Sequence, residues 1–189
     1  MGTLEARGPR TALAGYFLTG MLFTFLGAVL PSWGYHLTEL YAEAGNYFLG
    51  FNCGLFAAYR SSRKLISSKG VRWCLVMASS LSCLALLLLA AATSPSLRLL
   101  ALSGLGFAAG TLHGAILEAI TPIYRHDPAA TGNLGGIYFG LGALFMALLI
   151  AGTYYAYTIT TILIVLAMVP ACFAIWYGRM DWEVQPPSG

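Results

Sequence analysis

Six apolar runs, separated by short polar segments, constrain this sequence more than any other feature. We expect them at 11–33, 44–58, 73–92, 97–122, 133–151 and 157–177. A helix needs about 20 mostly apolar residues to cross a bilayer. Only 9% of the 189 residues are charged, whereas soluble domains contain roughly 25%. The sequence therefore predicts an all-α, multi-pass integral membrane protein in which residues 11–178 form a bundle of six transmembrane helices.

Basic residues predict the orientation of this bundle. If residues 1–10 are cytoplasmic, nine of the ten Lys and Arg residues fall on the cytoplasmic side, and only Arg98 falls outside. Such a split is a strong positive-inside signal, so both termini, including the tail 179–189, are expected on the cytoplasmic side. The expected location is a bacterial-type inner membrane. A basic cytoplasmic loop after the second helix is expected to set this topology rather than to bind nucleic acid. This loop contains Arg60, Arg63 and Lys64.

The expected fourth helix carries the ionisable side chains at membrane depth. His113 lies near the middle of the stretch 97–122, and Glu118 follows five residues later. Ionisable residues in a bilayer usually face protein or a water-filled cavity. An unperturbed imidazole has a pKa of about 6.5, so His113 is a candidate for proton coupling or for binding a polar substrate. The alternative is a neutral histidine bonded to a neighbouring helix. Glu118 is expected to be an acid in an inner gate or an ion-pair partner of Arg60 or Arg125.

Further polar residues are candidates for a substrate or proton pathway that includes His113. If the first, second, fourth and fifth helices line a cavity, Asn52 joins His113 as a substrate contact, and Asn133 and Tyr138 are further candidates on the fifth helix. Amides at this depth otherwise bridge helices. Tyr16 and Tyr138 are candidates to stack on a sugar or an aromatic ligand, but tyrosines in such proteins also belong to packing or to the interfacial belt.

Glycines recur every four positions in two of the expected helices. The second helix contains Gly50 and Gly54, and the fifth contains Gly132, Gly136 and Gly140. Such rows of small residues let helix backbones approach closely in lipid. Two interpretations are open: tight packing within one bundle, or docking of a second bundle.

These features resemble the N-terminal half of a major facilitator superfamily transporter. The stretch 54–64, GLFAAYRSSRK, is similar to the superfamily signature Gly-x-Leu-Ala-Asp-Arg-x-Gly-Arg-Lys, with Ala58 at the aspartate position. Within the superfamily, the fucose-permease-like sugar transporters look closest. The run 133–143 is similar to their fifth helix, and His113 stands where they carry a proton-linked glutamate.

A weak internal repeat agrees with this resemblance. Gly15 and Pro31 match Gly106 and Pro122 at a constant offset of 91 residues. That offset pairs the first helix with the fourth and the second with the fifth, as in an inverted three-plus-three repeat.

The resemblance implies a half-size secondary active transporter. Members normally have twelve spans in two six-helix halves with the substrate between them, so a second bundle is expected, either another copy or a separate C-terminal-type half. The expected activity is movement of a small polar solute, sugar-like or another metabolite, by alternating access, with His113 as the candidate for proton coupling. The alternatives are a non-transporting membrane scaffold or assembly subunit, and a fragment of a twelve-helix transporter.

Other function classes have no support in the sequence. No Walker loop, HExxH motif, nucleophile elbow or cluster of metal ligands is present. We therefore expect a protein that is not an enzyme, with no metal and no cofactor, whose partners are the lipid bilayer, a second bundle and a small solute.

Overall fold

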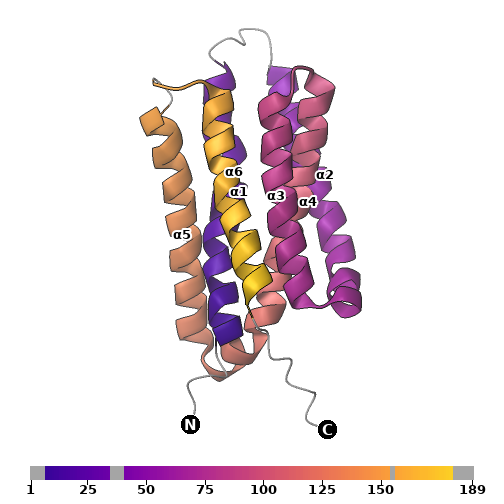
Figure 1. Cartoon of the computed structure of the whole chain (residues 1–189), viewed down its shortest axis with the longest axis vertical. Helices are drawn as coiled ribbons and strands as arrows, with labels where there is room; N and C mark the ends of the chain where they lie inside the picture. The colour runs from indigo at the N-terminus through magenta and orange to yellow at the C-terminus, as the bar shows by residue number, and fades with distance from the viewer. Residues whose placement is uncertain (1–6, 35–40, 154–155, 181–189) are drawn as a thin grey trace.

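The computed structural model describes residues 7–34, 41–153 and 156–180, and within these ranges it is built of helices without a strand (Figure 1). The helices are α1 (Arg7–Gly34), α2 (Tyr41–Lys69), α3 (Val71–Ala91), α4 (Pro95–His126), α5 (Pro128–Thr153) and α6 (Ile159–Arg179). The prediction of an all-α protein is confirmed. Most of the expected N-terminal segment and tail, residues 1–6 and 181–189, lies outside the described residues.

Five of these helices are long and apolar enough to cross a membrane, namely α1, α3, α4, α5 and α6. This is the property expected of an integral membrane protein. The remaining helix, α2, is long enough but is too polar over its length to count as such a span. It contains the expected second span, 44–58, but its last turns carry Arg60, Arg63, Lys64 and Lys69.

The basic segment after residue 58 is helical, so the prediction of a loop at Arg60, Arg63 and Lys64 is wrong. α2 continues without a break to Lys69. The sequence 59–69 contains neither glycine nor proline, and serine hydroxyls there donate to carbonyls three or four residues earlier. The helix ends at Gly70, whose φ of 85° is a conformation that glycine adopts without strain.

The connection between α4 and α5 is also shorter than expected. α4 runs through Pro122 to His126, and α5 begins at Pro128. A carboxylate oxygen of Asp127 accepts a hydrogen bond of 3.0 Å from the backbone N–H of Ala130. An aspartate cap followed by proline is a favoured helix start, so the chain reverses at this single residue.

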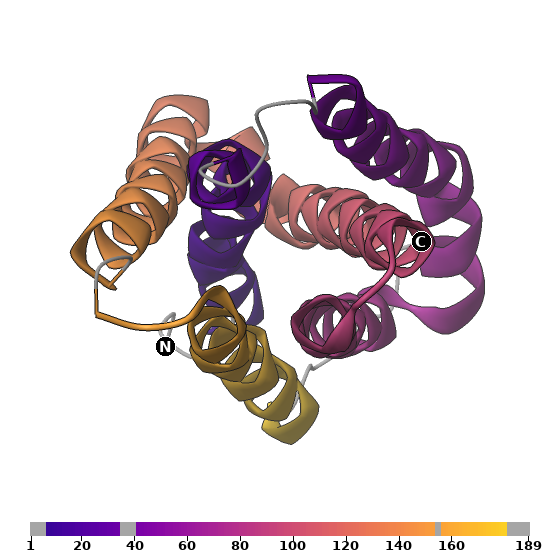
Figure 2. The same cartoon turned by 90° about the horizontal axis from the view of Figure 1, so that it is seen from above.

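α1 and α4 occupy the middle of the bundle, as the view from above shows (Figure 2). α5 packs along α1, and α2 packs along α4. α3 and α6 pack against each other and cover one side, with α3 also packing on α4. The largest fully buried side chains come mostly from the two central helices, for example Phe25 and Ile116. The opposite side of α1 and α4 is not covered by any described helix.

Two glycines bring α2 and α4 into backbone contact. A Cβ atom at Gly54 would overlap the carbonyl oxygen of Ser103, and a Cβ atom at Gly106 would overlap the carbonyl oxygen of Phe51. Each helix therefore places a glycine against the other helix's backbone. Contacts of this kind allow close helix approach in a membrane.

α1 and α5 meet through the same arrangement. A Cβ atom at Gly20 would overlap the carbonyl oxygen of Phe139, and one at Gly142 would overlap that of Phe17. The equivalent positions lie 86 residues apart in α1 and α4 and 88 residues apart in α2 and α5. The glycine contacts thus pair α1 with α4 and α2 with α5, as the internal sequence repeat does. The offsets between equivalent positions are shorter than the 91 residues of that repeat.

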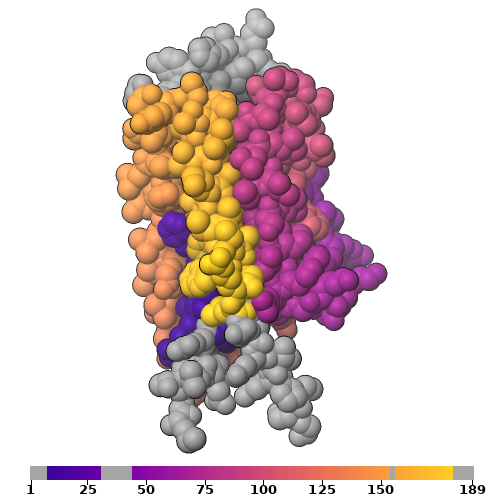
Figure 3. Space-filling model, viewed as in Figure 1, coloured from indigo at the N-terminus to yellow at the C-terminus, as the bar shows by residue number. Residues whose placement is uncertain are grey.

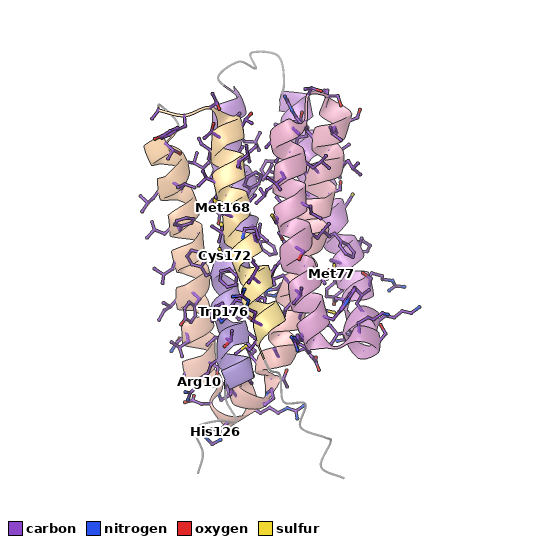
Figure 4. All side chains as sticks on the ribbon, viewed as in Figure 1. Arg10, Met77, His126, Met168, Cys172 and Trp176 are labelled. Atoms are coloured by element: carbon purple, nitrogen blue, oxygen red, sulfur yellow. The ribbon has the colours of Figure 1, made fainter. Side chains whose placement is uncertain are left out.

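Basic side chains gather at one end of the bundle. Arg10 of α1 and His126 of α4 lie at this end (Figure 4), as do the end of α2, the start of α3 and the end of α6 (Figure 1). The basic residues there are Arg10, Arg60, Arg63, Lys64, Lys69, Arg72, Arg125 and Arg179. Arg98 lies near the opposite end, where its Nε donates to the carbonyl of Ala92 at 3.4 Å.

Candidate functional site

His113 lies on the uncovered side of α4, between two aromatic rings of α1. Its ring centroid is 5.8 Å from that of Tyr16 and 6.3 Å from that of Phe23, both in edge-on geometry. The side chain is half-buried. Its Nδ1 atom is buried and has no hydrogen-bond partner within the described residues. Buried polar atoms in proteins are nearly always hydrogen-bonded, so Nδ1 has a hydrogen-bonding capacity that the described residues leave unused.

Phe23 joins four helices into one aromatic cluster around His113. Besides the histidine, its ring contacts Phe51 of α2 and Phe139 of α5, each with a centroid distance of 6.3 Å. The Phe23 side chain is 37% exposed. The cluster is therefore packed against the bundle on one side and open on the other.

A cavity of about 430 Å³ adjoins this cluster on the side of the basic end. It lies between α1, α4 and α5. Its lining consists of Tyr16, Leu117, Ile120, Thr121, Tyr124, Thr131, Gly132, Gly135, Gly136 and Phe139. Tyr16 and Phe139 belong to both the cluster and the cavity, and Leu117 follows His113 by one helical turn. The cavity thus begins about one turn from the imidazole.

The cavity lining is neutral, and its polar groups are hydroxyls. None of the lining residues is charged. Thr121 donates its hydroxyl hydrogen to the carbonyl of Leu117 at 2.9 Å, and Thr131 donates to that of Ile123 at 3.4 Å. The volume falls within the ~300–1,000 Å³ typical of small-molecule sites. This lining suits an uncharged ligand with a ring and few polar groups.

The structure does not bring Asn52 to His113. Asn52 is exposed on α2, and its amide donates to the carbonyl of Phe48 at 2.8 Å. The neighbouring glycines at 50 and 54 both approach Ser103, so Asn52 lies level with Ser103 on α4. Ser103 and His113 are separated by about 15 Å along the helix axis. The predicted joint contact of these two side chains with one substrate is therefore not supported.

The other predicted pathway residues also lie away from the cavity. Glu118 is exposed and projects about 140° around α4 from His113. The expected ion pair of Glu118 with an arginine is not found within the described part of the chain. Asn133 is exposed, and Tyr138 packs against the core. Phe139, one residue later and rotated by about 100°, takes the place expected for Tyr138.

The two glycine rows differ in their surroundings. Gly50 and Gly54 are buried against α4, so they serve packing within the bundle. Gly132, Gly136 and Gly140 are exposed, and a Cβ atom at any of them would meet no atom within 4 Å. Only this second row is open to a ligand or to another bundle.

Three phenylalanines of the site were not predicted from the sequence, namely Phe23, Phe51 and Phe139. Aromatic residues are common in every apolar run, so Phe23 and Phe51 had no distinguishing signal. Phe139 had one, because it follows Gly136 by three residues and Gly132 by seven, which places it on the face of the glycine row.

No protein-family model and no curated protein matches this sequence. Because a fold alone does not determine function, we infer the function from the arrangement of these residues.

Proposed function

We propose that this chain is one six-helix half of a secondary transporter of the major facilitator type, and that two copies form the working unit. The positions of the helices support this proposal. The central pair α1 and α4, the flanking pair α2 and α5, and the covering pair α3 and α6 correspond to the three pairs of a three-plus-three repeat. The matching glycine contacts of α1 with α5 and of α4 with α2 support the same correspondence.

The observation that carries the proposal is the uncovered face that holds the site. His113, Phe23 and the cavity lie on the side of α1 and α4 that no described helix covers, and Leu117 and Tyr124 on this side are nearly half exposed. A solute bound there would contact lipid unless a second bundle closed the site. In an alternating-access transporter, the substrate lies between two such bundles.

Charge and glycine placement favour a second copy as that bundle. The concentration of basic residues at one end gives every copy the same orientation in the membrane, so two copies can bring their uncovered faces together. The exposed row of Gly132, Gly136 and Gly140 provides a surface on which another helix can approach closely.

The proposed solute is small and uncharged, and it carries a ring. Aromatic rings of Tyr16, Tyr124 and Phe139 and a neutral lining favour such a molecule. His113 is the proposed contact for one of its polar groups, through Nδ1, and the proposed carrier of any coupled proton.

Cysteine accessibility tests alternating access without a known substrate. In a variant with the four native cysteines replaced, Gly27→Cys and Gly136→Cys place thiols one turn beyond Phe23 and in the cavity, respectively. Neither position has an atom within 4 Å of an added Cβ. A membrane-impermeant maleimide should reach Gly136→Cys from the basic side and Gly27→Cys from the other side.

The effect of a group attached at one thiol on the labelling of the other thiol tests the proposal. A bulky maleimide attached at Gly136→Cys should hold the basic side open and abolish labelling of Gly27→Cys, whereas the same group at Leu134→Cys, an exposed position on the other face of α5, should not. Labelling of Gly27→Cys that is unaffected by the attached group would favour a static scaffold and contradict the transporter.

A further inference from the structure

The last turns of α2 project from the side of the bundle. Ser62 is the last residue of α2 at the close contact with α4, where it lies against Gly114. Beyond it, Leu65 and Ile66 still pack against the core, but Arg63 and Lys64 are exposed. The space-filling view shows this segment extending beyond the neighbouring helices (Figure 3).

The exposed face of α2 changes from apolar to basic within about one turn. Leu49 and Phe56 are 63% and 71% exposed, and Arg60, Arg63 and Lys64 are exposed directly after them. At about 100° per residue, Leu49, Phe56, Arg60 and Arg63 fall within about 60° of one another, and Lys64 flanks Arg60. We name these five residues the basic stripe of α2.

The basic stripe has no acidic residue near it in the sequence. The sequence contains neither Asp nor Glu from residue 44 to residue 117. Within the described residues, Arg60, Arg63 and Lys64 form no ion pair. Their charges are therefore available to an anionic partner.

Neighbouring residues place the basic end of the stripe at the level of a membrane surface. Trp73 at the start of α3 and Trp176 near the end of α6 are both about half exposed, at 44% and 46%. Arg72 donates to the carbonyl of Gly178, which joins these two helix ends. Exposed tryptophans mark the interface between hydrocarbon and headgroups.

We propose that the basic stripe of α2 binds an anionic phospholipid of the adjoining leaflet. The acyl chains would lie along Leu49 and Phe56, and the phosphate would be held by Arg60, Arg63 and Lys64. Arginine suits this role because its planar guanidinium donates two parallel hydrogen bonds to phosphate oxygens. The proposal depends on the exposed face of α2 alone and not on transport.

Native mass spectrometry of the full chain released from nanodiscs tests the lipid site. The nanodiscs contain equal amounts of dioleoylphosphatidylglycerol and dioleoylphosphatidylcholine. The triple variant Arg60→Gln, Arg63→Gln, Lys64→Gln should lower the preference for the anionic lipid by about 100-fold, since each of the three cations contributes about fivefold.

A second triple variant tests whether the loss of any three positive charges at this end has the same effect. Lys69→Gln, Arg125→Gln and Arg179→Gln remove the same number of charges from the same end, and these side chains are also exposed. It should retain the wild-type preference. Equal losses in both variants, or a loss in neither, would overturn the proposal. Retention of phosphatidylglycerol by monomers but not by dimers would assign the stripe to a second copy and would overturn it as well.

Discussion

Replacement of Gly142 by alanine should separate α5 from α1. An ideal Cβ at position 142 would lie 2.8 Å from the carbonyl carbon of Phe17 and 3.0 Å from the backbone nitrogen of Met21. Carbon atoms in contact are normally about 3.5–4.0 Å apart. The neighbouring atoms belong to a helix backbone and cannot rotate away, so the two helices must move apart by about 1 Å.

The expected change in the free energy of unfolding has two opposing contributions. Overpacking of a tight interface typically costs about 1–3 kcal/mol, while replacement of a helical glycine by alanine gains about 0.5–1 kcal/mol. Gly140→Ala is the matched control, because it lies on the same helix and its Cβ would meet no atom within 4 Å. We expect Gly142→Ala to be less stable than Gly140→Ala by about 2 kcal/mol.

Reversible unfolding in mixed micelles, followed by circular dichroism, measures this difference. If the two alanine variants have the same unfolding free energy, the close contact between α1 and α5 is not present in the protein. Gly54→Ala provides an independent check, because its Cβ would meet the backbone of α4 in the same way.

Three further predictions concern a helix cap, a buried hydroxyl and the cavity. Asp127→Ala removes the acceptor for the N–H of Ala130 and should lower the unfolding free energy by about 1 kcal/mol; unchanged stability would contradict the cap. Tyr177→Phe removes a buried hydroxyl without a partner in the described structure and should raise the unfolding free energy by about 1 kcal/mol, whereas a loss would indicate a hydrogen bond. The uncharged aromatic probe 6-fluoroindole should bind in the cavity of the wild-type protein in nanodiscs, and this binding should broaden its ¹⁹F signal. Gly136→Leu fills the cavity and should abolish the broadening. Gly152→Leu, which lies on α5 outside both the cavity and the docking row, should preserve that broadening. Equal spectra of the two variants would exclude the cavity as the binding site.

The sequence predicted the helices well where apolar runs alone determine them. The expected spans 73–92 and 157–177 differ from α3 and α6 by one or two residues at each end. The error at α2 has a physical cause. Charged residues at 60–69 indicate solvent or headgroup contact but not a loop, and only Gly70 contributes a backbone conformation that ends the helix.

Of the residues in the aromatic cluster, the sequence predicted only His113 and, as a candidate for ring stacking, Tyr16. His113 stood out because charge is rare at membrane depth. The rings of Tyr16 and Phe23 around it depend on how α1 crosses α4, which a single sequence does not encode in any local pattern. Asn52 was misplaced for the same reason, since its height relative to His113 depends on the glycine contacts between α2 and α4.

The most direct test of the account is the native mass of the full chain in nanodiscs. In the proposed transporter, a second bundle covers the face that holds His113 and the cavity, and the basic end gives two copies the same orientation. We expect a species of twice the 20.2 kDa chain mass, which Gly140→Trp, on the docking row but outside the cavity lining, should convert to the single-chain mass. A wild-type chain that is monomeric at every concentration would contradict it.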